Sequence, residues 1–191
     1  MKLQLPHLSN PHKIKNLKNY RNMEATTLSA ASVYVGTYGK YNNGSLFGAW
    51  LDLSDYADKE EFYEACRELH KDEEDAEFMF QDWEGIPSQF ASESSVKWAF
   101  IEAFRQAQDE GRAAAFVAWA DYTGECDYDA FDEAYCGEAE SEEDFAYGFV
   151  EDHGLLNEVP ESLRVYFDYE AYARDLFSSG YVFHEGYVFS N

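Results

Sequence analysis

The sequence is poor in positive charge and lacks the features of several common protein classes. Only 14 of its 191 residues are Lys or Arg, against 38 Asp or Glu, and the formal net charge is −24. No apolar run approaches the ~20 residues that a membrane span needs, and the N-terminus has no apolar stretch of the signal-peptide kind. The three cysteines, Cys66, Cys126 and Cys136, match no CxxC spacing. They indicate reduced thiols in a cytoplasmic protein, with no disulfide framework.

The sequence also lacks the motifs that common catalytic sites require. No HExxH, GxSxG, GxGxxG or phosphate-binding loop occurs, and no Cys/His cluster is present. The stretch from Asp127 to Asp132 departs from a calcium loop, because Phe131 and Asp132 stand where an oxygen ligand and Gly are required. We therefore expect no catalytic residues, no metal and no cofactor. A carboxylate metal enzyme stays open as an alternative, since 38 acids form many pairs by chance.

The negative charge is distributed unevenly. Residues 1–32 hold five basic groups and one acid, so residues 33–191 hold 37 acids and 9 bases, a net charge of −28. A body of that charge repels nucleic acid and anionic membranes and attracts basic surfaces. Aromatic residues make up 18% of the chain, which predicts a folded body despite the charge. We interpret residues 1–32 as a basic, disordered tail, within which Met23 is an alternative start.

Periodicity in the first half of the body predicts strands followed by helices. Strands are expected at residues 33–35, 46–53 and 77–83, the first two forming a hairpin through Asn43-Gly44. A helix capped by Ser54 or Asp55 is expected to bury Phe62, Ala65, Cys66 and Leu69. A second helix is expected to begin at Ser94 or Ser95, and an Ala-rich buried helix covers residues 112–120.

The C-terminal half predicts further capped helices and a closing hairpin. Ser141 with Asp144 forms a capping-box pattern, and Asp168 is expected to cap a later helix. Residues 181–183 and 187–189 read as a final hairpin. This order predicts an α+β fold of two or three small units.

Three explanations compete for the total acidity: solubility or halophilic adaptation, an acidic buffer, and imitation of a polyanion. The aromatic content argues against the first, and the spread of acids through foldable segments argues against the second. A net charge of −28 matches about 14 base pairs of duplex DNA, at two charges per pair. The candidate partner-binding acids are Glu60, Glu61, Glu64, Glu68, Asp72, Glu73, Glu74, Asp75, Asp127, Asp129, Asp132, Glu133, Glu138, Glu140, Glu142 and Glu143.

Several segments together resemble one known family. They are Val33–Val35 with Gly39–Trp50, Gln81–Glu84, Tyr135–Glu138 with Ser141–Ala146, Gly154–Leu163 and Tyr166–Leu176. In these segments the chain resembles the ArdA antirestriction proteins of mobile genetic elements, across most of residues 33–189. The tail at 1–32 lies outside the resemblance.

The resemblance implies an elongated, curved protein that forms a homodimer. It implies three small domains, which we place at 33–93 (N-terminal, α+β), 94–133 (middle, helical) and 134–191 (C-terminal, α+β). It also implies that the protein mimics bent duplex DNA, occupies the DNA-binding groove of type I restriction-modification enzymes at their methyltransferase and specificity core, and catalyses nothing. Neither nucleic acid nor membrane is expected as a partner.

The stretch His153–Tyr166 is similar to the family's antirestriction motif, which the resemblance places near the dimer interface. Its apolar residues, the candidates for that interface, are Leu155, Leu156, Val159 and Leu163. Their helical spacing is equally typical of plain core packing, and that alternative stays open. An acidic module that binds another basic, DNA-binding partner is the alternative to the whole functional hypothesis.

Overall fold

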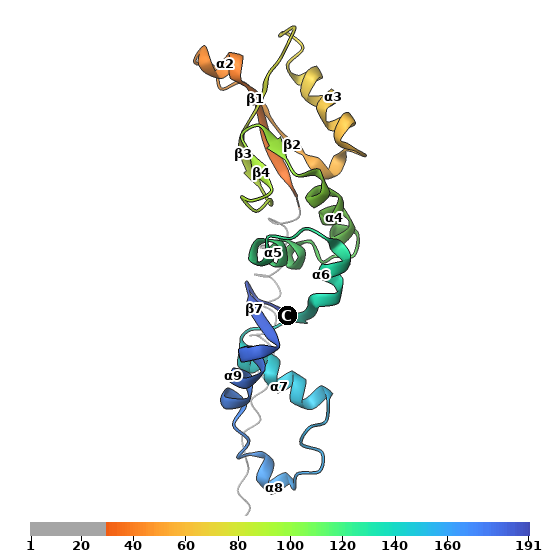
Figure 1. The fold of residues 1–191 in the computed structure, drawn as a ribbon, viewed down its shortest axis with the longest axis vertical. Helices are drawn as coiled ribbons and strands as arrows, with labels where there is room; N and C mark the ends of the chain where they lie inside the picture. Colours follow the sequence, from red (N-terminus) through yellow and green to blue (C-terminus); the bar gives the residue numbers. More distant parts are fainter. Residues whose placement is uncertain (1–29) are drawn as a thin grey trace, which may run out of the picture.

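The computed structural model describes residues 30–191, which form small antiparallel sheets and short helices (Figure 1). In the first sheet, β1 (Ser32–Thr37) lies between β2 (Ala49–Asp52) and β3 (Phe78–Glu84) and is antiparallel to both. The predicted hairpin and third strand are confirmed. The hairpin connection is more than a turn, because it contains the short helix α2 (Tyr38–Asn42), whose first turn the Thr37 hydroxyl caps. Residues 1–29 of the predicted tail lie outside the described residues.

Helix α3 (Lys59–Leu69) packs beside this sheet and begins later than predicted. The cap is Asp58, which accepts a hydrogen bond from the Glu61 backbone N–H, while the Glu61 carboxylate accepts from Ala57 N–H at 2.6 Å. The prediction of Ser54 or Asp55 as the cap was wrong, because residues 53–55 form the 3-10 turn η1 (Leu53–Asp55) that buries Leu53. The predicted inner face is confirmed at Phe62 and Cys66, which are buried.

Three helices and a small hairpin follow the sheet. The hairpin is β4 (Ala91–Ser92) with β5 (Ser95–Val96), and the helices are α4 (Trp98–Asp109), α5 (Ala113–Thr123) and α6 (Tyr128–Ala134). The prediction that α4 begins at Ser94 or Ser95 was wrong. The Ser92 hydroxyl donates to the Ser95 carbonyl oxygen at 3.2 Å, so these serines close the β-turn instead of capping the helix. The Ala-rich helix is confirmed as α5.

The C-terminal sheet has the order β6-β8-β7, all antiparallel, with β6 (Tyr135–Glu138), β7 (Tyr181–His184) and β8 (Tyr187–Ser190). The predicted hairpin is confirmed, and Glu185 and Gly186 turn it with φ of 49° and 88°. Helices α7 (Glu142–Asp152) and α9 (Tyr169–Ser179) pack on each other, and α8 (Glu161–Arg164) lies between them in the chain. Ser141 and Asp168 are confirmed as caps of α7 and α9.

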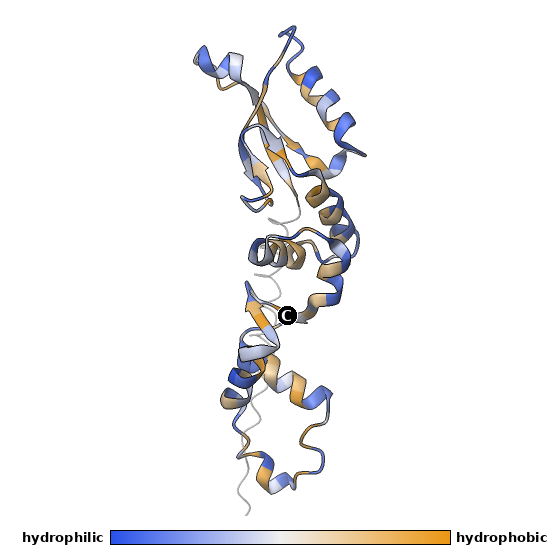
Figure 2. Cartoon of the chain, viewed as in Figure 1, coloured by the Kyte–Doolittle hydropathy of each residue, from blue (hydrophilic) through white to orange (hydrophobic). Residues whose placement is uncertain are grey.

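Aromatic side chains form most of the interior. The rings of Phe100 and Phe116 lie 5.4 Å apart, and Phe131 contacts Phe116 edge-on at 5.5 Å. The same buried cluster extends from Ala31 and Val33 in the first sheet to Phe189 in the last. In Figure 2, α5 carries the hydrophobic colours, while α3 turns a hydrophilic face outward. The buried residues of α7 and α9, which are Ala146, Val150 and Ala173, are not part of this cluster.

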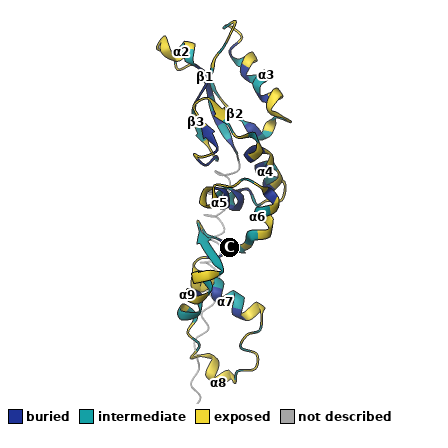
Figure 3. Cartoon of the chain, viewed as in Figure 1, coloured by how far each residue is buried: buried dark blue, intermediate teal, exposed yellow. Residues whose placement is uncertain are grey.

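The elements follow one another along the long axis of Figure 1. The first sheet and α3 lie at one end, α4 to α6 in the middle, and α7 to α9 at the other end. Figure 3 shows that α8 and the segments flanking it are exposed, in contrast to the buried faces of α4 and α5. None of the helices formed by residues 30–191 has the length and apolar character to cross a membrane.

Candidate functional site

The candidate acids lie on the protein surface. Of the sixteen side chains predicted as partner-binding, fifteen are exposed, and that of Glu73 is half-buried. Among the other acidic residues from 30 to 191, only Asp52 is not exposed, and none is buried. The fold thus places its carboxylates in solvent, as the cost of burying an unpaired charge requires.

Helix α3 shows how periodic structure spaces the acids. Phe62 and Cys66 are buried, so Glu60, Glu61, Glu64 and Glu68 occupy the outer face. Its 11 residues span about 16 Å, at 1.5 Å per residue. One strand of DNA carries one phosphate per ~3.4 Å. Four carboxylates on about 16 Å approach that density, but the exposed Lys59 and Arg67 on the same helix reduce the net charge.

Some of the predicted acids already have a cation within the chain. Lys40 lies 2.8 Å from the Asp72 carboxylate and 3.2 Å from that of Glu73, and Lys71 lies 2.7 Å from Glu68. Hydrogen bonding from Lys40 lowers the pKa of Asp72 below its ordinary value. The Lys71–Glu68 pair is exposed on both sides, and such pairs contribute about 0–1 kcal/mol.

Lys40 also connects this surface to the interior. Its ammonium lies 3.0 Å from Nδ1 of the fully buried His70, whose Nε2 lies 3.2 Å from the Val35 carbonyl oxygen. Because an ammonium and a carbonyl oxygen have fixed roles, Nδ1 accepts and Nε2–H donates. Lys40, Asp72 and Glu73 therefore fasten the loop after α3 to the first sheet, which makes these acids partly structural.

Arg112 has a similar role between α4, α5 and α6. Its guanidinium bonds to the Asp132 carboxylate at 2.7 Å, and also to the Glu110 carboxylate and the Tyr128 hydroxyl. It lies over the Phe131 ring at 5.4 Å. These carboxylates raise the pKa of Arg112. Asp132 is thus largely neutralised by its own chain.

The acids that follow α5 have a different setting, because no Lys or Arg occurs between Arg112 and Arg164. This interval, which we call the cation-free stretch, holds 15 acidic residues, and all of them are exposed. It covers α6, β6 and α7 and includes the predicted acids from Asp127 to Glu143. Within it, Asp132 is paired to Arg112.

The densest part of the cation-free stretch surrounds the start of α7. Glu138, Glu140, Glu142, Glu143 and Asp144 fall within seven residues. The last three lie in the first turn of α7, where the helix dipole favours negative charge. Asp144 also accepts from the Glu140 backbone N–H at 3.0 Å, and Ser141 caps the helix. Local structure therefore holds this dense group of carboxylates in place.

The candidate interface residues lie in the exposed segment between α7 and α9. Leu155 is 47% exposed and Leu163 is 55% exposed, while Leu156 and Val159 are half-buried. Plain core packing therefore does not account for Leu155 and Leu163, whereas it remains an explanation of the half-buried Leu156 and Val159. Arg164 holds the segment in shape by donating to the carbonyl oxygens of Val159 and Asn157.

The predicted site residues left out two parts of this surface, although Val165 and Tyr166 fall within the stretch His153–Tyr166 that the resemblance places near the dimer interface. Val165 and Tyr166 are the most exposed large apolar residues in the described chain, at 78% and 80%, and they adjoin Leu163. Seven acids of the cation-free stretch were not among the predicted acids: Asp121, Glu125, Asp144, Glu151, Asp152, Glu158 and Glu161. The gap in Lys and Arg was visible in the sequence and would have indicated them. In residues 30–191 we find no group of three His, Cys, Asp or Glu side chains placed to hold a metal ion.

Comparison with known proteins adds one finding. The model of the antirestriction protein family ArdA matches residues 33–189, which is most of the chain. Individual curated proteins gave no match. The matched range begins within β1 and ends within β8, so it covers the three sheets and the cation-free stretch.

Proposed function

The chain belongs to the ArdA antirestriction family, and from that premise we propose that it inhibits type I restriction-modification enzymes by mimicking duplex DNA. On this proposal it occupies their DNA-binding groove at the methyltransferase and specificity core, in the cytoplasm, and catalyses nothing. One observation carries the proposal: 15 exposed acids stand between Arg112 and Arg164 with no Lys or Arg among them.

Electrostatics supports this mode of action. A groove that binds DNA presents Lys and Arg to phosphates, and it attracts any surface of similar charge density. The net charge of −28 on residues 33–191 corresponds to about 14 base pairs, and a symmetric dimer corresponds to about 28. Because exposed charges contribute little one by one, we expect the effect to be collective.

We further propose that three domains, at 33–93, 94–133 and 134–191, form an elongated, curved body. The order of the elements along the axis of Figure 1 supports this arrangement. We propose that two copies join through the exposed segment carrying Leu155, Leu163, Val165 and Tyr166, since exposed apolar patches commonly mark interfaces. Small-angle scattering should then give an extended particle of twice the 22.0 kDa chain mass. A compact monomer would contradict this part.

A cleavage assay tests the inhibition. Purified protein is added to a type I restriction enzyme with unmodified DNA, and to a type II enzyme with the same DNA as a control. We expect cleavage by the type I enzyme to stop at low molar ratio and the type II enzyme to be unaffected. Inhibition of neither enzyme across salt concentrations would favour the alternative, an acidic module that binds another basic, DNA-binding partner.

A further inference from the structure

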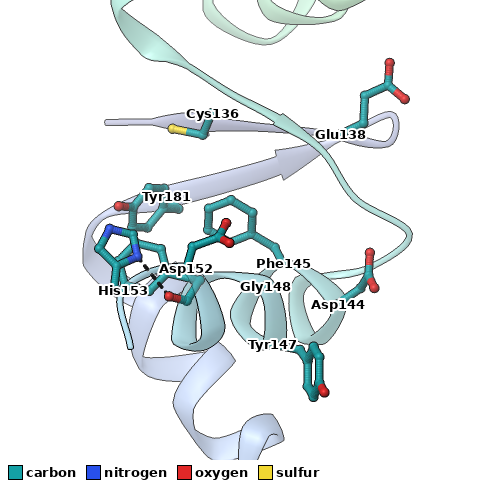
Figure 4. Close-up of a pocket in the computed structure, with 10 residues that line it drawn as sticks. Cys136, Glu138, Asp144, Phe145, Tyr147, Gly148, Asp152, His153 and Tyr181 are labelled. Atoms are coloured by element: carbon teal, nitrogen blue, oxygen red, sulfur yellow. Dashed lines mark hydrogen bonds between the residues drawn. The ribbon is translucent and has the colours of Figure 1, made fainter. Parts of the chain in front are cut away.

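A pocket opens on the C-terminal part of the chain, between α7 and the strands β6 and β7 (Figure 4). Its volume is about 560 Å³, within the range of ligand-binding clefts. The rings of Phe145, Tyr147, Phe149 and Tyr181 line it. The Phe145 ring lies 5.2 Å from that of Tyr181 and 6.0 Å from that of Phe149. Cys136 of β6 lies across the pocket from α7 in Figure 4.

The polar groups around these rings are mainly acidic. Glu138, Asp144 and Asp152 are among the residues that line the pocket, and no Lys or Arg is. In Figure 4 the Glu138 carboxylate points away from α7. In Figure 4 the Asp152 carboxylate lies on the side of α7 that faces β6, between the rings of His153 and Phe145. Aromatic faces and carboxylates both attract cations, and together they are the usual surroundings of a bound organic cation.

The end of α7, like those of α5 and α6, has no cation in its last turn. A helix C-terminus carries partial negative charge and favours Lys or Arg nearby. The last turn of α7 instead contains Glu151 and Asp152 and no basic residue. Helix α4 also ends in an aspartate, Asp109, but there Arg112 follows and pairs with Glu110. No Lys or Arg follows α7 until Arg164, whose guanidinium donates to backbone carbonyls of its own loop.

His153, which follows α7, has no free N–H at Nδ1 to offer to the nearby carboxylates. That nitrogen lies 2.8 Å from the Phe149 carbonyl oxygen, so Nδ1–H donates to it, and the ring stacks on Phe149 at 4.0 Å. In the neutral ring, Nε2 is then an acceptor. The pocket thus combines aromatic faces, carboxylates and one imidazole acceptor, all of which suit a flat donor-rich cation.

We propose that this pocket receives an arginine side chain of the inhibited enzyme, an inference that rests on the proposed function. A guanidinium suits it better than an ammonium, because it stacks on rings while donating several hydrogen bonds in its plane to carboxylates. The pocket would add one specific contact to the collective attraction of the acids, and arginines are among the residues that often dominate binding at interfaces.

A titration with a small probe tests the pocket itself. N-acetyl-arginine amide is added to the ¹⁵N-labelled full-length protein, and backbone shifts are followed at constant ionic strength. We expect saturable shifts at residues 145–153 and 181, and weaker shifts with N-acetyl-lysine amide. Weak shifts spread over all acidic segments, without saturation, would overturn the proposal.

Two variants and one matched control sharpen the titration. Asp152→Asn should weaken arginine binding up to about fivefold, the usual effect of one exposed charge at a contact. Asp109→Asn makes the same change at the end of α4 and should have no effect. Cys136→Phe leaves the charge unchanged and should weaken binding by filling the space. Equal affinities of the Asp152→Asn and Asp109→Asn variants would contradict the proposal.

Inhibition of a type I enzyme separates this proposal from the proposed function. If the wild-type protein inhibits and the Asp152→Asn variant is weaker than the Asp109→Asn variant, both stand. If it inhibits and the two variants are equal, the arginine pocket fails and the mimic remains. If arginine binds the pocket saturably but no type I enzyme is inhibited, the proposed function fails. The inference that the arginine comes from the inhibited enzyme then fails as well. If Asp152→Asn converts a dimer to a monomer, the source is a second copy and the proposal is overturned.

Discussion

Neutralising the dense acids before and within the start of α7 should weaken inhibition far more than the same charge change elsewhere. The variant replaces Glu138, Glu140, Glu142 and Glu143 by Gln and keeps Asp144 and Ser141, which cap the helix. All four side chains are exposed. Exposed charge pairs contribute roughly 0.2–1 kcal/mol each. Four of them total about 1–4 kcal/mol, which predicts a rise in the inhibitor's Kd of about 5- to 1000-fold.

The fold should survive this change with a modest loss. Glu142 and Glu143 lie in the first turn of α7, where each negative charge stabilises the helix by about 0.3–1 kcal/mol. Urea denaturation should therefore show about 1–2 kcal/mol lower free energy of unfolding. The inhibition constant is measured by titrating cleavage by a type I enzyme at several salt concentrations. The variant's inhibition should also depend less steeply on salt than that of the wild type.

A matched control separates local from total charge. Glu84, Glu102, Glu170 and Glu185 are exposed and scattered over the chain, and replacing them by Gln changes the net charge by the same amount. The scattered variant should lose clearly less inhibition than the clustered one. Equal losses, or undiminished inhibition by the clustered variant with its fold intact, would refute the reasoning.

Three further predictions concern Arg112, Cys66 and Leu163. Arg112→Gln should lower the free energy of unfolding by about 1–2 kcal/mol in urea, because the half-buried guanidinium bonds to the hydroxyl of the buried Tyr128 as well as to two exposed carboxylates, whereas Lys71→Gln, in an exposed pair, should change it by less than about 1 kcal/mol. Burial raises the pKa of Cys66 to about 12, so a thiol reagent at pH 8 should modify the exposed Cys136 and reach Cys66 only on unfolding. With that raised pKa, the thiol's contribution to stability is complete below its unfolded pKa and declines as pH rises from there toward about 12, a decline that Cys66→Ala should remove. Leu163→Asp should give a monomer by light scattering with an unchanged melting temperature, because Leu163 is 55% exposed in the single chain; an unchanged mass would remove it from the proposed interface.

Much of the fold could be predicted because it depends on local chemistry. Ser141 and Asp168 cap their helices through bonds to the backbone three residues ahead, and the final hairpin turns at Glu185-Gly186 with positive φ. The starts of α3 and α4 were predicted wrongly for the same reason. Ser and Asp also close turns, and Ser95 is used in the β4–β5 turn instead of a cap.

The exposure of the acids was predictable, but their pairing was not. Sequence alone shows that Asp72, Asp132 and Glu138 are surface residues. Lys40 reaches Asp72 across 32 positions and Arg112 reaches Asp132 across 20, contacts that only the fold creates. The pocket beside Asp152 likewise depends on β6 and β7 meeting α7, although the gap in Lys and Arg that surrounds it was already visible in the sequence.

The central claim is that the protein takes the place of DNA, and a competition measurement tests it most directly. Fluorescent duplex DNA is bound to the methyltransferase core of a type I enzyme, and the protein is titrated in at several DNA concentrations. Mimicry predicts full displacement, an apparent Kd for DNA that rises linearly with protein concentration, and no complex containing all three components. A ternary complex of enzyme, DNA and this protein, or a plateau of partly displaced DNA, would contradict the account.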